Sequence, residues 1–298
     1  MKLKDLIFEA DGKPKAVVMA GGGGAGKSTF LKQVDVTVPV LNPDKYVEGQ
    51  DMHLAAASKM VEKEVEEMVS QGKSFIWDTT ASNPAKVESL LQAGYDVMMV
   101  MVYTHPMISF LSNFERERKI PKIGVLSTWQ GAYSLIETYR KMLGDNFHLV
   151  SNTRGGKYDK QIEAFNAAAQ KGGQALSSFL DSLDVETKST FSKEVEMSKE
   201  DAELFGSLLN QTDIPQDDEG GMKYLQRDFL KNPSLYEKQG FGRLEKRYEA
   251  YLRDKEKREQ KYISTLDSIA ATLQSPAIKG MEAEDTSSVA GKVQQFLS

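Results

Sequence analysis

The sequence contains no cysteine and only three histidines among its 298 residues. The lack of cysteine excludes disulfides, thiolate metal sites and cysteine nucleophiles. His53, His105 and His148 are far apart in the chain, and none of them has the spacing of a metal ligand. We therefore expect chemistry that uses neither a thiol nor a histidine-bound metal.

Long apolar runs and an excess of basic charge are also absent. No stretch has the length and hydrophobicity of a signal peptide or a membrane span, so we expect a cytoplasmic protein without a membrane partner. Lys and Arg number 38 against 43 Asp and Glu, which gives a formal net charge of -5. This balance excludes a uniformly basic surface for nucleic acid, although it permits a local basic face.

Apolar segments that alternate with helical patterns are present in the first half. Hydrophobic residues make up 40% of the chain, enough for a sizeable core. Five short segments are mostly apolar, as expected for strands buried on both faces of a parallel sheet. They are residues 15–20, 36–41, 74–78, 97–103 and 147–150. We predict an α/β domain over residues 1–155, with a five-stranded parallel sheet and helices on both faces.

Residues 156–298 show no confident strand pattern and are predicted to be mainly α-helical. This C-terminal region contains an acidic segment over residues 181–221 and a basic helical segment over residues 223–262. The stretch from Ser275 onward is small and polar and is expected to fray, although residues 289–297 have the pattern of a short helix.

A glycine-rich loop follows the first predicted strand and precedes a helix. It has the Walker A pattern G-x-x-x-x-G-K-[ST], in the strand–loop–helix context that this motif requires. Such a loop turns its backbone amides toward phosphate oxygens, while the lysine reaches the β- and γ-phosphates and the serine hydroxyl ligates Mg²⁺. The predicted nucleotide-binding residues are Gly21, Gly22, Gly23, Gly24, Ala25, Gly26, Lys27, Ser28 and Thr29.

Polar side chains follow the second and third predicted strands. Ligands bind beyond the carboxyl ends of strands in an open parallel sheet, so these side chains are candidate site residues. Asp44 would face the glycine loop and take the proton of an attacking hydroxyl, or it would simply form an Asx-turn or helix cap. Asp78 would hold Mg²⁺ or the acceptor. Thr79, Thr80 and Asn83 would bind the acceptor, unless Asn83 only caps the helix at Pro84.

Two arginines lie beyond the fourth predicted strand, in the segment from Asn113 to Pro121. Arg116 and Arg118 would neutralise the charge of the transferred phosphoryl group. Residues two apart do not share a helix face, so only one of them is expected to reach the phosphates unless the segment bends as a lid. The alternative is a charged, solvated helix.

Taken in order, these motifs resemble the small P-loop kinases. The similarity is to the bacteriophage-type polynucleotide 5′-kinase domain and the related zeta-toxin-like kinases, and it covers residues 14–152. The resemblance implies an ATP- and Mg²⁺-dependent phosphotransferase in which Asp44 is the general base, and Lys27, Ser28 and Arg116 or Arg118 serve the phosphates. It also implies that residues 78–83 hold the acceptor and that Lys45 is the nearby basic group. If the gene belongs to a phage, the location would be the cytoplasm of the bacterial host.

Three functions remain open at this level. The first is a kinase of a polynucleotide 5′-hydroxyl, which a basic, tyrosine-bearing stretch in residues 243–258 would support by following a phosphate backbone. Interleaved acidic residues indicate instead a solvated or self-pairing helix. The second is a zeta-toxin-like kinase of a nucleotide sugar or other small hydroxyl compound. The third is a nucleotide-gated interaction module, whose helical C-terminal region binds a protein partner or self-associates.

Overall fold

The computed structural model describes residues 12–50, 54–115, 121–183 and 196–298. The chain forms two compact units. The first comprises Met1–Val185 together with Thr265–Ser298, and the second comprises Glu186–Ser264. This division differs from the predicted boundary at residue 155, because residues 156–185 and the C-terminal segment from Thr265 both belong to the first unit. Within the described residues, no helix combines the length and the apolar character needed to cross a membrane.

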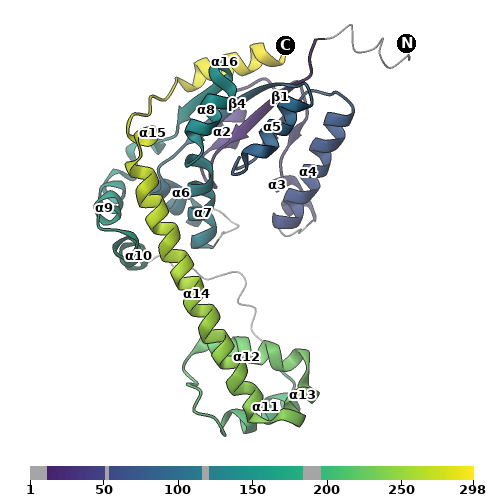
Figure 1. The fold of residues 1–298 in the computed structure, drawn as a ribbon, viewed down its shortest axis with the longest axis vertical. Helices are drawn as coiled ribbons and strands as arrows, with labels where there is room; N and C mark the ends of the chain where they lie inside the picture. The colour runs from purple at the N-terminus through teal and green to yellow at the C-terminus, as the bar shows by residue number, and fades with distance from the viewer. Residues whose placement is uncertain (1–11, 51–53, 116–120, 184–195) are drawn as a thin grey trace. The chain divides into compact units, whose positions relative to one another are not determined.

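The first unit is built on a five-stranded parallel sheet, which confirms the predicted α/β fold (Figure 1). The strand order is β2-β3-β1-β4-β5. The strands are β1 (Lys15–Ala20), β2 (Val40–Leu41), β3 (Phe75–Asp78), β4 (Asp96–Tyr103) and β5 (Phe147–Ser151). Of the predicted strands, the second is much shorter than expected: only its last two residues pair with β3.

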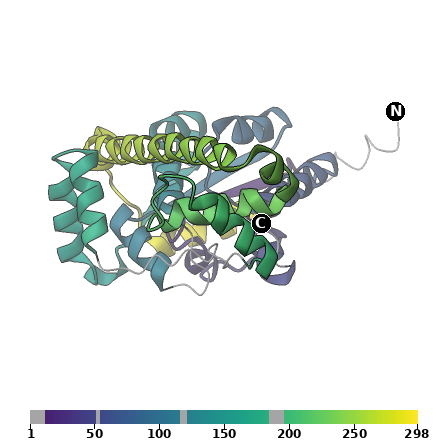
Figure 2. The same ribbon diagram turned by 90° about the horizontal axis from the view of Figure 1, so that it is seen from below.

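Helices cover both faces of the sheet, as predicted. The helices that connect the strands are α2 (Lys27–Leu31), α3 (Asp44–Gln50), α4 (Leu54–Ser70), α5 (Pro84–Gln92), α6 (Pro106–Phe114), α7 (Lys122–Tyr133) and α8 (Ile136–Leu143). The segment before β5 forms two helices, α7 and α8, with a break at Ser134 and Leu135. After β5, a 3₁₀ turn (Arg154–Gly156) leads to α9 (Asp159–Ala169) and α10 (Gly173–Ser182), which lie side by side in Figures 1 and 2.

The C-terminal segment is ordered against the sheet, so the expectation that it frays was wrong. Two helices, α15 (Pro276–Lys279) and α16 (Thr286–Leu297), follow α14 (Phe241–Gln274). Val289 and Val293 of α16 are fully buried in a cluster with Met19 of β1 and Phe30 of α2. Figure 1 shows α16 beside the sheet. This helix therefore completes the hydrophobic core beneath the glycine loop.

The second unit has a hydrophobic core of its own. It contains α11 (Lys199–Leu209), α12 (Glu219–Lys231), α13 (Pro233–Gln239) and the first part of α14. The buried residues of this core are Phe205, Leu208, Leu209, Ile214, Leu225, Phe229, Tyr236 and Leu244. Arg243 and Arg247 of α14 pair with Asp228 of α12 at 3.5 and 2.7 Å. These two basic residues hold helices of the unit together. Within α14, Arg253 pairs with Glu249 at 3.8 Å, as the self-pairing interpretation expects.

His105 makes the stability of the first unit sensitive to acid. Its Nδ1 accepts a hydrogen bond from Met107 N (3.2 Å) at the start of α6, and its Nε2 lies 3.0 Å from Asn166 Oδ1. Burial lowers the pKa of His105 from 6.5 to about 4, although the hydrogen bond to Asn166 opposes the shift. Between these two values the unfolded chain binds a proton that the folded chain does not bind. Folding stability is therefore lost as the pH falls through this window.

We expect His105→Asn to remove most of this acid sensitivity. Asparagine keeps an acceptor for the helix N-terminus but has no proton to gain. Between pH 7.5 and pH 4.5, the free energy of unfolding of the wild type should fall more than that of the variant, by about 2 to 3 kcal/mol. Urea denaturation at several pH values measures this difference. Parallel pH profiles for the two proteins would contradict the assigned role of His105.

Candidate functional site

A cavity of about 450 Å³ lies at the carboxyl ends of the strands and brings most of the predicted site residues together, although Gly21, Gly22 and Lys45 do not line it. The glycine loop forms one wall, and the residues that follow β2 and β3 form another. The lining residues are Gly23, Gly24, Ala25, Gly26, Lys27, Ser28, Thr29, Asn42, Pro43, Asp44, Ser58, Val61, Glu62, Trp77, Asp78, Thr79, Thr80, Ala81, Ser82, Asn83, Lys86, Val87, Thr128 and Arg154.

Glycine is required in the loop for conformation and for space. Gly24 and Gly26 have φ angles of +81° and +99°, in the left-handed region where other residues are strained. A Cβ atom on Gly26 would lie 2.4 Å from the side-chain nitrogen of Asn152, and a Cβ atom on Gly22 would lie 3.0 Å from Trp129 Cα. The loop can therefore adopt this path only because side chains are absent at these positions.

The backbone amides of the loop are arranged to receive an anion. The Gly22 amide donates to the Tyr133 hydroxyl (3.3 Å), and the Gly23 amide donates to Thr128 Oγ1 (3.4 Å). The amides of Gly24, Gly26, Lys27 and Ser28 have no partner among the described residues. Successive unpaired amides beside a lysine fit a phosphate chain, so the loop suits the nucleotide that its motif predicts.

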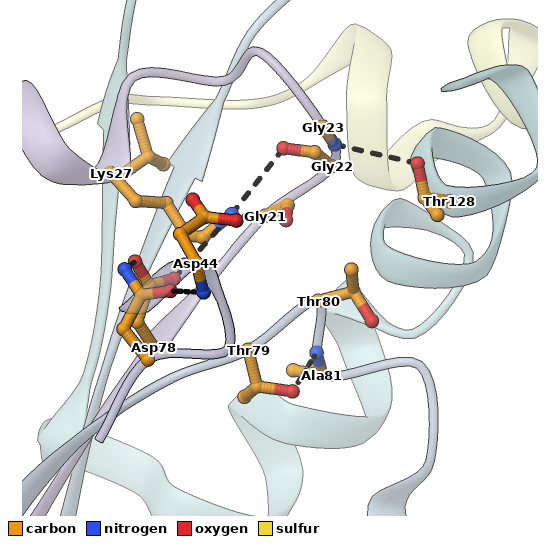
Figure 3. Close-up of polar contacts among 12 residues, drawn as sticks. Gly21, Gly22, Gly23, Lys27, Asp44, Asp78, Thr79, Thr80, Ala81 and Thr128 are labelled. Carbon is orange, nitrogen blue, oxygen red and sulfur yellow. Dashed lines mark hydrogen bonds and ion pairs between the residues drawn. The ribbon is translucent and has the colours of Figure 1, made fainter. Parts of the chain in front are cut away.

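Lys27 and Asp78 are held together beside the loop (Figure 3). The Lys27 ammonium donates to Gly21 O (3.0 Å) and lies 3.6 Å from Asp78 Oδ1. Asp78 Oδ2 accepts a hydrogen bond from Asn42 Nδ2 at 3.0 Å. The side chains of Lys27 and Asp78 are 15% and 8% exposed, so their attraction is poorly screened by water. Asp78 thus ends its strand buried and charge-paired, next to the predicted phosphate site.

The protein offers few oxygen ligands near the loop. This suits Mg²⁺, which completes its coordination with water and phosphate oxygens, better than a metal held by protein ligands alone. Within the described ranges, no three His, Asp or Glu side chains are grouped to hold a metal ion. Ser28 and Asp78 both line the cavity. One hydroxyl and one carboxylate are typical of Mg²⁺, which usually keeps several waters and binds the phosphates of its nucleotide. The predicted pair, Ser28 and Asp78, therefore fits the expected ion.

Asp44 lines the cavity as the first residue of α3, with its side chain exposed. Its backbone amide donates to Asn42 Oδ1 at 2.8 Å, so Asn42 forms the turn and also supports Asp78. Among the described residues, the Asp44 carboxylate accepts no hydrogen bond from this turn, which Asn42 makes instead. It is free to face a ligand in the cavity that the glycine loop lines (Figure 3).

Residues 79–83 form a polar wall of the same cavity. Thr79 Oγ1 accepts from the Ala81 amide (3.3 Å), and the Thr80 hydroxyl donates to Ser82 Oγ (3.3 Å). The Asn83 side chain accepts from Ala85 N and caps α5, which confirms the capping interpretation of this residue. Ala81 has a φ angle of +51°, and its carbonyl is held by the buried Tyr139 hydroxyl at 2.7 Å. The hydroxyl groups of Thr79, Thr80 and Ser82 therefore lie at the wall of the cavity.

The basic residue of this region is not the one predicted. Lys45 donates to both carboxylate oxygens of Glu64 (2.6 and 2.7 Å) and does not line the cavity. Lys86 of α5 lines it instead, paired with Glu62 of α4 and 5.9 Å above the Trp77 ring. No motif marks Lys86 in the sequence, because its position depends on how α4 and α5 pack. The other predicted cations, Arg116 and Arg118, lie outside the described residues.

Asn152 and Arg154, directly after β5, are further site residues that the motif analysis missed. The Asn152 side chain donates to Ala25 O at 2.9 Å and accepts from the Arg154 amide at 3.2 Å. Arg154 lines the cavity. The signal that could have found them is their place at the end of the fifth predicted strand, where ligands of parallel sheets bind.

Comparison with known proteins points to one group of P-loop kinases. Residues 48–125 match the family model described as Zeta toxin. This segment includes the polar wall at residues 78–83 and begins after the glycine loop. A search of curated proteins finds no match. The match confirms, over this segment, the predicted resemblance to zeta-toxin-like P-loop kinases, which supports phosphoryl transfer as the general class of activity.

Two solved structures show only distant likeness. One comes from work on the PezAT chromosomal toxin–antitoxin system of the human pathogen Streptococcus pneumoniae. It is 23% identical with a TM-score of 0.35, over 48% of this chain and 70% of that one. The other is the sulfotransferase domain of the Synechococcus PCC 7002 olefin synthase. It is 13% identical with a TM-score of 0.29, and the match covers 58% of this chain and 76% of that one. Both scores are too low to inform the function of this chain.

Proposed function

We propose that this chain is an ATP- and Mg²⁺-dependent kinase that phosphorylates a hydroxyl group of a small acceptor, such as a nucleotide sugar. The observation that carries the proposal is the shared cavity. One continuous space is lined by the glycine loop, by Lys27 and Asp78, and by the exposed Asp44 carboxylate. A donor phosphate and an acceptor hydroxyl would therefore meet in a single site.

Each residue has a distinct role in this proposal. The amides of the loop and Lys27 bind and orient the phosphate chain, and Ser28 and Asp78 hold the magnesium ion. Bound ATP supplies the γ-phosphoryl group, and Mg²⁺ offsets its negative charge. Asp44 would accept the proton of the acceptor hydroxyl as its oxygen bonds to the γ-phosphorus, and ADP would leave with the oxygen that bridged the β- and γ-phosphates. Thr79 and Thr80 offer hydroxyls to the acceptor from the wall of the cavity, and Asn83 offers its amide nitrogen, since its oxygen caps α5.

A small acceptor is favoured over the polynucleotide end that the motifs first suggested. The Zeta toxin match covers the polar wall of the cavity. Three of the basic residues that favoured a polynucleotide are held in ion pairs: Lys45 with Glu64, and Arg243 and Arg247 with Asp228. Glu62 and Lys86 supply a carboxylate and an ammonium group in the cavity, which suit the hydroxyls and charge of a small polar compound.

A transfer assay with γ-labelled ATP tests this function. The acceptors are nucleotide sugars, nucleosides and 5′-hydroxyl oligonucleotides, each incubated with wild type, Lys27→Ala and the matched control Lys45→Ala. We expect label on a small acceptor with wild type and Lys45→Ala, and a loss of at least about 1,000-fold with Lys27→Ala. Label on oligonucleotides alone would overturn the small-acceptor proposal. ATP binding without any transfer would favour a nucleotide-gated interaction module.

A further inference from the structure

Among the described residues, Arg154 is the cation of the cavity for which no ion-pair partner is found. Lys27 pairs with Asp78, and Lys86 pairs with Glu62. In the part of the chain that the structure describes, no carboxylate lies within 4.0 Å of the Arg154 guanidinium. The charge of Arg154 contributes slightly to the lowered pKa of Glu115. The Glu115 carboxylate itself accepts hydrogen bonds from Lys157 and from the Tyr158 hydroxyl. The exposed guanidinium is therefore available to an anion in the cavity.

The backbone of Arg154 is held in a conformation that suits glycine better than arginine. Its φ angle is +52°, and Gly155 and Gly156 follow with φ angles of +61° and +77°. A left-handed conformation is costly for a residue with a Cβ atom, and such strain concentrates at ligand-binding sites. The side chain of Asn152 fixes this conformation through the Arg154 amide while its nitrogen holds Ala25 O in the glycine loop. Arg154 and the loop are thus positioned by one residue.

The strand order places Arg154 at the opposite end of the site from Asp44 and Asp78. Asp44 and Asp78 follow β2 and β3 on one side of β1, whereas Arg154 follows β5 on the other side. Lys27, which reaches the β- and γ-phosphates in this motif, pairs with Asp78 on the β3 side. A nucleotide lying across the loop would therefore direct its γ-phosphate toward Asp44, and its α-phosphate toward β5 and Arg154.

We propose that Arg154 binds the α-phosphate of the donor nucleotide. The inference rests on the proposed nucleotide-binding function of the same cavity. It explains why an arginine occupies a left-handed position between Asn152 and two glycines, where a third glycine would relieve the strain. A guanidinium can donate two parallel hydrogen bonds to a phosphate, which makes it better suited to this task than a lysine.

Isothermal titration with ADP and thermal melting without nucleotide test the proposal together. Arg154→Gly should weaken ADP binding about tenfold and should raise the melting temperature by about 2 °C, because glycine relieves the left-handed strain. Arg154→Lys keeps the charge and the strain, so its melting temperature should be unchanged and its affinity intermediate. Lys160→Gln removes one exposed charge from nearby α9 and should bind ADP as the wild type does.

Opposite changes in stability and affinity are the signature of a ligand-binding role. A lower melting temperature together with weaker binding would show a structural role and overturn the proposal. Unchanged ADP affinity in Arg154→Gly would also overturn it while leaving the kinase function intact. If the wild type itself binds neither ADP nor ATP, the proposed function fails, and the role of Arg154 fails with it.

Discussion

Asp44→Asn is expected to slow phosphoryl transfer by about 100- to 10,000-fold while leaving ATP affinity within about twofold. The substitution keeps the size of the side chain and removes only its ability to take a proton. Asp44 is exposed at the cavity. Lys27, which serves the nucleotide, forms its ion pair with Asp78 and not with Asp44. Single-turnover transfer from labelled ATP measures the chemical step, and titration of ATP measures binding in the same preparation.

Lys45→Gln is the matched control for this experiment. It changes the next residue of α3, which pairs with Glu64 away from the cavity. Its transfer rate should stay close to that of the wild type. An Asp44→Asn protein that transfers phosphate at the wild-type rate would show that another group accepts the proton. A proportional loss of ATP affinity would instead place Asp44 in nucleotide binding.

Val293→Asp is expected to lower the free energy of unfolding of the first unit by about 4 kcal/mol or more. Val293 of α16 is fully buried against Met19 of β1 and Phe30 of α2. A carboxylate there would lose its water without gaining a partner. Because Phe30 belongs to the helix that follows the glycine loop, nucleotide affinity should fall as well. Urea denaturation measures the stability, and titration of ADP measures the affinity.

Ser287→Asp provides the same added charge on the exposed side of α16. It lies in the first turn of the helix, where a negative charge is tolerated or slightly favourable. Its stability should stay within about 0.5 kcal/mol of the wild type. If Val293→Asp were equally harmless, α16 would not be part of the core, and the C-terminal segment would be dispensable for the fold.

The sheet and the glycine loop were predictable because their residues obey strong local rules. After their first residues, Lys15 and Asp96, β1 and β4 are apolar, as expected of strands buried on both faces. The loop motif and the Asn83-Pro84 helix start depend only on residues that are adjacent in the chain. The shortness of β2 was not predictable, because pairing of residues 36–39 depends on the path of β3 rather than on their own β-branched side chains.

The C-terminal region was harder to predict because its contacts join distant parts of the chain. The polar composition after Ser275 concealed the few valines of α16 that pack against β1, more than 250 residues earlier. The basic stretch of α14 resembled a nucleic-acid surface. The pairing of Arg243 and Arg247 with Asp228 becomes visible only when α12 and α14 are packed together.

The candidate site was predictable where strand ends determined it and unpredictable where helix packing did. Asp44, Asp78 and residues 79–83 meet at the cavity because parallel strands end at the same edge. Lys45 was predicted as the basic residue of the site because it directly follows Asp44 in the sequence. On a helix, successive side chains point in different directions, and Lys45 points toward Glu64. Lys86 reaches the cavity from α5, and Arg154 from a left-handed turn that its own residue type disfavours.

A crystal structure with a non-hydrolysable ATP analogue and Mg²⁺ tests the central claim most directly. The predicted complex has the phosphate chain on the amides of Gly24, Gly26, Lys27 and Ser28, with the γ-phosphate directed toward Asp44. A nucleotide bound elsewhere would contradict the account. So would a γ-phosphate directed away from Asp44, because no acceptor could then be activated in this cavity.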